Sequence, residues 1–279
     1  YSNATPLAEL VTTPNTPQRE RLSVRTADAE FLDAGAKVEV CPRTKFVGRR
    51  RIIQRCLRVL HSVEGDEHYY EGVLLHGIAG LGKSSLAARL CERMPSHRRI
   101  VLVGALSEAE LTRSFYDRLC DLGSLDVLFD SRLDFKQRMR RLFQSELRLQ
   151  RMLIVFDDFE HNLELNNAGR YVIKPQAMAI LTTMLQAIRD TGSESRVIVT
   201  SRYQFTLPGH IELYEESIES LRGADLTKMV DHLRNLKQAD VSAQMLASQA
   251  LEIAGGNPRL LTRLDRVIGD LRDDSEQCR

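Results

Sequence analysis

The sequence has no long apolar run: none of its hydrophobic stretches approaches the roughly 18 residues that a helix needs to span a bilayer. Residues 1–38 are polar, so we expect no signal peptide either. An excess of charge is also lacking, because 39 basic and 38 acidic residues leave a net charge of +1. We therefore expect neither a membrane nor a nucleic acid as a partner.

Cysteine is scarce and shows no pairing pattern. The five cysteines are odd in number and form no C-x-x-C pair; they stand at positions 41, 56, 91, 120 and 278. This pattern argues against a disulfide framework and fits a reducing cytoplasm, which is the location that we expect. With 43% hydrophobic residues, the 279-residue chain can form one large α/β domain and a small one.

The most informative feature that is present is a glycine-rich segment. It fits G-x-x-x-x-G-K-[ST], the phosphate-binding loop (P-loop) of nucleotide hydrolases. The apolar run before it and the helical pattern after it provide the strand–loop–helix context that this chemistry needs. Its residues, with the adjoining serine, are the expected nucleotide contacts: Gly77, Ile78, Ala79, Gly80, Leu81, Gly82, Lys83, Ser84 and Ser85.

The residue types in this loop suit the binding of a polyphosphate. Glycines reach φ values that other residues resist, so backbone N–H groups can turn inward around an anion. The N-terminus of the following helix adds a partial positive charge. We expect Lys83 to reach the β- and γ-phosphates and the hydroxyl of Ser84 to bind Mg²⁺.

Apolar strands alternate with helical patterns along the chain, which predicts an α/β fold with a parallel sheet flanked by helices. Strands are expected at residues 72–76, 99–104, 152–156, 197–200 and 211–214. Helices are expected at residues 46–62, 85–94, 107–122, 132–149 and 175–190, and a polar loop at 160–174. Three further helices, near 223–235, 241–254 and 258–271, indicate a small all-helical subdomain after the sheet.

These patterns divide the chain into four parts. We expect an N-terminal linker at residues 1–43, a P-loop nucleotide-binding domain at 44–216, the helical subdomain at 217–272 and a tail at 273–279. Three prolines among polar residues suggest that the linker has little structure of its own. The predicted helix at 132–149 is rich in arginine, and we interpret this charge as a solvated face.

Acidic residues follow the most apolar strand of the chain. Asp157 comes directly after residues 152–156, where a carboxylate would stand at the edge of the sheet beside the P-loop. Since Mg²⁺ prefers carboxylate oxygen and water, we expect Asp157 to hold the metal through a water ligand. Asp158 or Glu160 would orient or deprotonate the attacking water, and the sequence leaves this choice open.

A further polar strand end follows at Thr200-Ser201-Arg202. The tips of neighbouring parallel strands lie close together, and a guanidinium offers forked donors for phosphate oxygens. We therefore expect Arg202 to contact the γ-phosphate. Two more segments are weak signals on their own: Phe46-Val47-Gly48-Arg49 and Gly255-Gly256-Asn257-Pro258.

Together, these segments resemble the STAND class of signal-transduction ATPases, which is related to the NB-ARC and NACHT modules. The likeness covers about residues 44–272 and includes five motifs in the family's order. They are Phe46–Arg49, Gly77–Ser84, Leu153–Asp158, Thr200–Arg202 and Gly256–Pro258. The resemblance implies that Val47, Gly48, Arg49 and Pro258 contact the nucleotide, with Val47 and Pro258 flanking the adenine, and that Arg202 senses the terminal phosphate.

The same resemblance implies a molecular switch that binds ATP or ADP with Mg²⁺, hydrolyses ATP slowly and forms a homo-oligomer when activated. Its implied partners are effector and sensor domains of the same full-length chain, and similar bacterial proteins often carry a CHAT protease as effector. Two alternatives are a catalytically silent nucleotide-binding scaffold and a DNA-associated ATPase of the AAA+ type. The near-zero net charge stands against the second alternative.

Overall fold

We describe the fold from a computed structural model of the chain. The structure describes residues 29–63, 65–66, 69–122, 125–209, 211–237 and 244–277. The linker predicted at residues 1–43 therefore lies largely outside the described residues, as do the first residues of the helix predicted at 241–254. Within the described part of the chain, no helix is both long and apolar enough to cross a membrane.

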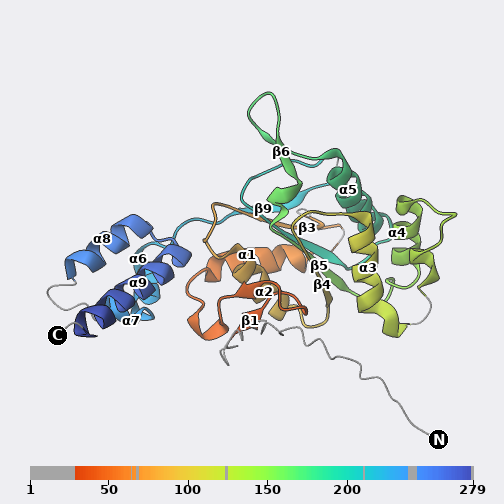
Figure 1. Cartoon of the computed structure of the whole chain (residues 1–279). Coiled ribbons are helices and arrows are strands. Elements are labelled where there is room, and N and C mark those ends of the chain that lie inside the picture. The colour runs from red at the N-terminus through yellow and green to blue at the C-terminus, as the bar shows by residue number, and fades with distance from the viewer. Residues whose placement is uncertain are drawn as a thin grey trace, which may run out of the picture.

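A five-stranded parallel sheet forms the centre of the larger domain, which confirms the predicted fold class (Figure 1). Its strands, in spatial order, are β4 (Arg98–Val103), β5 (Met152–Asp157), β8 (Arg196–Ser201), β3 (Gly72–His76) and β9 (Leu213–Ser217). Every residue of β5 and β8 is buried, as expected for central strands covered on both faces. Strand β8 thus separates the strand that leads into the P-loop from the strand that ends in Asp157.

Helices cover both faces of this sheet. Helices α3 (Glu108–Leu119), α4 (Phe135–Gln144) and α5 (Pro175–Asp190) pack on one face, whereas α1 (Arg50–Leu60) and α2 (Lys83–Glu92) pack on the other. Side chains of β5 alternate between the two cores: Ile154 and Phe156 join the first, and Leu153 and Val155 join the second. Short 3-10 helices lie at Arg43–Lys45 (η1), Cys120–Leu122 (η2), Asp126–Leu128 (η3) and Phe159–Asn162 (η4).

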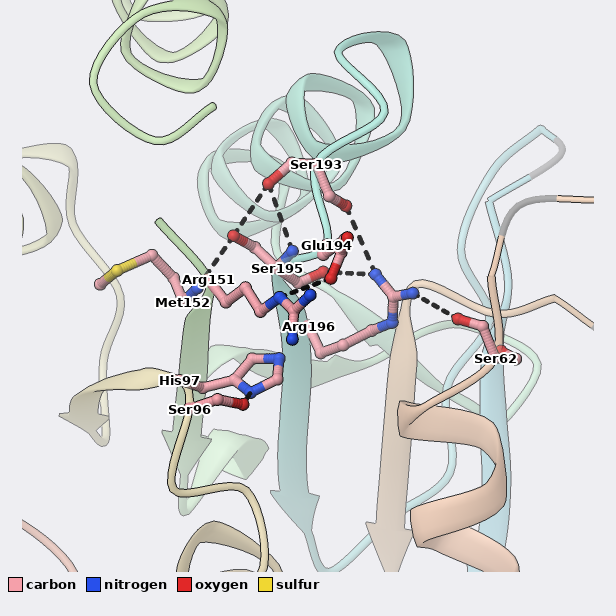
Figure 2. Close-up of polar contacts among 9 residues, drawn as sticks. All are labelled: Ser62, Ser96, His97, Arg151, Met152, Ser193, Glu194, Ser195 and Arg196. Carbon is pink, nitrogen blue, oxygen red and sulfur yellow. Dashed lines mark hydrogen bonds and ion pairs between the residues drawn. The ribbon is translucent and has the colours of Figure 1, made fainter. Parts of the chain in front are cut away.

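A buried polar network fixes the amino ends of the central strands, opposite the P-loop (Figure 2). The hydroxyl of Ser195 accepts a hydrogen bond of 3.0 Å from the backbone N–H of Met152 at the start of β5. The guanidinium of Arg196 donates to the carbonyls of Ser193, Ser195 and Ser62. These bonds tie β8 to β5 and to the loop after α1.

Within the described residues, two antiparallel hairpins lie outside the sheet. The first, β1 (Glu30–Phe31) and β2 (Glu39–Val40), occupies part of the segment that we expected to have little structure of its own. The second, β6 (Leu163–Leu165) and β7 (Tyr171–Ile173), lies in the predicted polar loop at 160–174, so that prediction was wrong. Three-residue strands are too short to produce a recognisable alternation of apolar and polar residues.

The C-terminal helices form the expected small helical subdomain beside the sheet (Figure 1). They are α6 (Gly223–Asp231), α7 (Arg234–Lys237), α8 (Gln244–Ala254) and α9 (Pro258–Gln277). The subdomain has a core of its own, built from residues such as Leu236, Ala250 and Leu261. Strand β9 ends at Ser217, and the segment that follows leads to α6.

Candidate nucleotide-binding site

The P-loop joins β3 to α2 and depends on its glycines. Gly77, Gly80 and Gly82 have φ values of +146°, +83° and +88°, which side-chain-bearing residues rarely adopt. A Cβ atom on Gly77 would stand 2.5 Å from the carbonyl oxygen of Ile218, and one on Gly80 would stand 2.6 Å from Asn257 Oδ1. Two of the glycines therefore also make room for the segments that pack against the loop.

The side chain of Lys83 lies inside this loop. Lys83 is 7% exposed, and its ammonium donates to the carbonyl oxygens of Gly77 at 2.7 Å and Ile78 at 3.1 Å. Burial lowers the pKa of Lys83, whereas the carboxylates of Glu160 and Asp158 oppose this shift. The loop thus holds a desolvated cation in its own curve, where an anion would find a strong electrostatic partner.

The two predicted metal ligands, Ser84 at the start of α2 and Asp157 at the end of β5, lie close together, and Thr200 of β8 also contacts Asp157. Asp157 is 1% exposed, and Thr200 Oγ1 donates to its Oδ1 at 2.6 Å. Burial raises the pKa of Asp157, while hydrogen bonds from Thr200 and Ser84 lower it. A carboxylate and a hydroxyl in contact are oxygen donors of the kind that Mg²⁺ prefers, so these residues fit the ion. Their metal-binding role stays a prediction.

The two candidate hydrolytic carboxylates have different surroundings. Asp158 directly precedes η4 and has a left-handed backbone (φ +53°) and an exposed side chain. The side chain of Glu160 is 11% exposed and forms an ion pair with Arg202, with 2.8 Å between Oε1 and Nε. The backbone N–H of Arg202 also donates to Glu160 Oε2 at 3.2 Å. The predicted γ-phosphate sensor is therefore bound to one of the two predicted bases.

The Val47-Gly48-Arg49 segment lies between the P-loop and the connection to the helical subdomain. Arg49 adopts a left-handed conformation (φ +64°) at the start of α1, and its guanidinium donates to the carbonyls of Leu81 and Glu219. Burial lowers the pKa of Arg49. Arg49 thus lies beside the P-loop, whereas the adenine-flanking roles of Val47 and Pro258 stay predictions.

Asn257 is a site residue that we did not predict from the sequence. It is 6% exposed, and its Nδ2 donates to the carbonyl of Ala79 in the P-loop at 2.9 Å. Its Oδ1 accepts from the backbone N–H groups of Arg259 and Leu260 at 3.1 and 3.3 Å, which caps α9. The Arg259 N–H also lies 3.3 Å from the carbonyl of Gly80. Asn before Pro predicts a helix cap, but no sequence signal predicts its contact with the P-loop.

Comparisons with known proteins found relatives in sequence and in fold. The curated relatives include the Holliday junction branch migration complex subunit RuvB of Nocardia farcinica, which is 25% identical over 86% of this chain and 62% of its own length. The chain thus spans less than two thirds of that relative. A Walker-type ATPase of Pyrococcus abyssi has the same fold, with a TM-score of 0.52, 14% identity and coverage of 84% of this chain and 77% of its own. Cdc6p from Pyrobaculum aerophilum matches with a TM-score of 0.53 and 15% identity over 81% of this chain and 62% of its own.

The family follows from a match over more than half of the chain. The profile of the AAA ATPase domain covers residues 45–199, from the Val47-Gly48-Arg49 segment through the P-loop to β8. That stretch contains Lys83, Asp157 and Glu160, the residues around which the site is built. The chain belongs to the AAA ATPase domain family.

Proposed function

We propose that this chain is the nucleotide-dependent switch of a larger signalling or defence protein, and that its P-loop is also the docking surface of the helical subdomain. One observation carries the proposal: Asn257 and Arg259, at the start of α9, bind the carbonyls of Ala79 and Gly80. A ligand that changes the backbone of this loop changes the groups on which the subdomain rests. Binding and docking are therefore linked, and each biases the other.

The site has the groups that a Mg-ATP complex needs. The loop glycines have the positive φ values that let backbone amides turn toward an anion, Lys83 supplies a buried cation, and Ser84 and Asp157 would supply oxygen ligands for the metal. When bound, the nucleotide supplies the phosphoanhydride bond, and its metal neutralises charge on the phosphate oxygens. Arg202, at the tip of β8, is the candidate donor to the terminal phosphate oxygens.

Slow turnover fits the state of Glu160. Both of its carboxylate oxygens accept hydrogen bonds from Arg202, one from the side chain and one from the backbone. Because both oxygens already accept from Arg202, they are not free to contact an attacking water, so Glu160 would act as a base only after Arg202 has left it. Asp158 is the alternative base, and its exposed carboxylate needs no such release.

The resemblance of the motifs to STAND proteins extends this proposal to activation. ADP would keep the subdomain docked, and ATP would favour a second arrangement that exposes a surface for self-association. To change the ratio of the second arrangement to the docked arrangement from 1:99 to 99:1, ATP must bind the second arrangement more favourably by about 5.5 kcal/mol. A few charge-assisted hydrogen bonds, at about 1.5–3 kcal/mol each, provide that difference. Effector and sensor domains of the full-length chain would transmit and receive the signal.

Two measurements test the proposal. Lys83→Ala should weaken binding of Mg-ADP and Mg-ATP by at least about 100-fold in calorimetry, because a buried charge partner of the phosphates is lost. Lys136→Ala, an exposed lysine on α4, is the matched control and should bind normally. Fluorescence energy transfer between labels on α5 and α8 should then differ between the ADP and ATP states. Equal transfer in both states would contradict the switch.

A second candidate function, a DNA-associated ATPase, has one observation in its favour. The exposed side of α4 and the segment after it carry Lys136, Arg140 and Arg148, which form no ion pair within the described residues. Arg141 and Phe129 line a neighbouring pocket of about 650 Å³. Phe129 is 59% exposed and makes an edge contact with Tyr116. Cations beside exposed aromatic rings suit a single-stranded nucleic acid.

This candidate predicts salt-dependent binding of a labelled single-stranded oligonucleotide. If three side chains contact phosphates, a plot of the logarithm of the binding constant against the logarithm of the salt concentration should have a slope of about −2. Replacing Lys136, Arg140 and Arg148 with glutamine should remove the slope, whereas the same change at exposed Arg50 and Arg51 of α1 should not. Absence of binding at low salt would eliminate the candidate and leave the solvated-face interpretation.

A further inference from the structure

The hairpin β6–β7 is connected to the segment that carries Arg202. In Figure 1 it projects from the larger domain on the side of β9 and α5. The ring of Tyr171, in β7, stacks on the ring of Tyr203 with 3.6 Å between centroids and 14° between planes. Tyr203 directly follows Arg202, so this stack links the hairpin to the candidate γ-phosphate sensor. The nucleotide chemistry described above makes no use of the hairpin.

The base of the hairpin is fixed to the sheet. Asn162, 3% exposed, accepts from the backbone N–H of Leu106 at 2.7 Å and donates to the carbonyl of Gly104 at 2.8 Å, both in the segment after β4. Its own carbonyl accepts from the N–H of Lys174 at 2.8 Å, directly after β7. The two ends of the hairpin are thus joined to each other and to the sheet, so Tyr171 provides a fixed point.

The segment of Arg202 has weaker anchors than the hairpin. The side chain of Arg202 is 53% exposed. The backbone N–H and the side-chain Nε of Arg202 both donate to the carboxylate of Glu160. The N–H of Tyr203 donates to Ser201 Oγ at 3.1 Å, a local bond within the same segment. When Arg202 leaves Glu160, Gln204 and Phe205 keep their contacts with Glu215 and Phe159, and the stack of Tyr203 on Tyr171 is the side-chain contact next to Arg202 itself.

We propose that Tyr171 is a positioning residue for γ-phosphate sensing, because its stack on Tyr203 limits where Arg202 can go when it exchanges Glu160 for a terminal phosphate. This inference rests on the proposed role of Arg202. Without the stack, the segment after β8 has more conformations, and ordering it around a terminal phosphate costs more entropy. ADP lacks that phosphate, so its affinity should not depend on Tyr171.

The test compares the affinities of ADP and a non-hydrolysable ATP analogue, both with Mg²⁺. Tyr171→Ala should reduce the preference for the ATP analogue over ADP by about 2- to 12-fold, the range expected for one aromatic pair, and leave ADP affinity unchanged. Tyr171→Phe keeps the ring and should retain the wild-type preference. Tyr203→Ala should have the same effect as Tyr171→Ala, and the double variant should lose no more than either single one.

Two further variants separate the possible failures. Leu165 is the cross-strand partner of Tyr171, and the side chain of Leu165 is 61% exposed. Leu165→Ala changes the hairpin but keeps the stack of Tyr171 on Tyr203. This variant controls for damage to the hairpin and should have the wild-type preference for the ATP analogue. Arg202→Ala tests the sensor itself. If Arg202→Ala loses the preference for the ATP analogue and Tyr171→Ala keeps it, the positioning role is overturned. If Arg202→Ala keeps the preference, the proposed sensor role fails, and the role of Tyr171 fails with it.

Discussion

Replacing Asn257 would show whether docking of the helical subdomain and nucleotide binding are coupled. The side chain has two separable contacts: Oδ1 caps α9, and Nδ2 donates to the carbonyl of Ala79 in the P-loop. Asn257→Ser keeps an oxygen that can cap the helix but is too short to reach the loop, and it adds no charge near the phosphates. Asn257→Ala removes both contacts.

The contacts of Asn257 set the expected magnitudes. Loss of the bond to Ala79 leaves a part-buried carbonyl without its protein partner, which costs about 1–2 kcal/mol and should shift the equilibrium between docked and undocked subdomain by a factor of about 5–30. Loss of the cap costs about another 1 kcal/mol, but that cost falls on the helix itself. Both variants should therefore weaken docking equally, and only Asn257→Ala should also lower the stability of the subdomain.

Titration with a fluorescent ADP derivative measures the coupling, and energy transfer between α5 and α8 measures docking. Asn257→Ser should raise the Kd for ADP by about 5–30-fold and lower the transfer efficiency. Asn235→Ala is a matched control, since Asn235 donates to the carbonyl of Asp265 inside the subdomain at 2.9 Å. It should destabilise the subdomain and leave ADP binding unchanged. Wild-type ADP affinity in Asn257→Ser would refute the coupling.

Two further predictions concern the acidic residues. Because burial raises the pKa of Asp157, its ionised form destabilises the ligand-free protein, and stability should rise as pH falls through that raised pKa. Asp157→Asn should remove this pH dependence and raise the Tm of the ligand-free protein. The variant should also lose the additional Tm increase that nucleotide gives only in the presence of Mg²⁺. A lower Tm than wild type in the ligand-free variant at neutral pH would contradict the argument. In single-turnover hydrolysis, substitution of the true base should cost at least about 100-fold. If that base is Asp158, Asp158→Asn should show the loss and Glu160→Gln should not, and the opposite result would assign Glu160.

The sheet could be predicted to the extent that its strands are apolar. Strands β5 and β8 are buried at every position, and their sequences contain long runs of branched residues. Strand β9 was predicted at 211–214 but lies at Leu213–Ser217, so it includes Glu215 and Glu216. Glu216 is buried because Arg55 forms an ion pair with it from α1, 161 residues away in the chain. Carboxylates disfavour a strand in any local assessment, and the partner that compensates is visible only in the fold.

In the candidate site, too, the features that depend on neighbouring residues could be predicted from the sequence, and those that depend on distant contacts could not. The P-loop was predictable because its glycines, Lys83 and Ser84 lie within eight consecutive residues whose spacing has a chemical reason. The pairing of Glu160 with Arg202 joins residues 42 positions apart, and the bond from Asn257 to Ala79 joins residues 178 positions apart. Neither follows from periodicity or composition, because both depend on how the subdomain and the strand ends pack.

The position of Arg49 supports the view that the outer side of the P-loop is a binding surface. A positive φ and a cation at a helix N-terminus are both unfavourable, so contacts elsewhere must offset them. Arg49 makes those contacts with the carbonyls of Leu81 and Glu219, and Asn257 binds the carbonyl of Ala79. The carbonyls of Gly77 and Ile78 accept from Lys83 within the loop, whereas those of Ala79, Gly80 and Leu81 accept from Asn257, Arg259 and Arg49. Phosphate binding would then reach the subdomain through these carbonyls, without a contact between the subdomain and the phosphate.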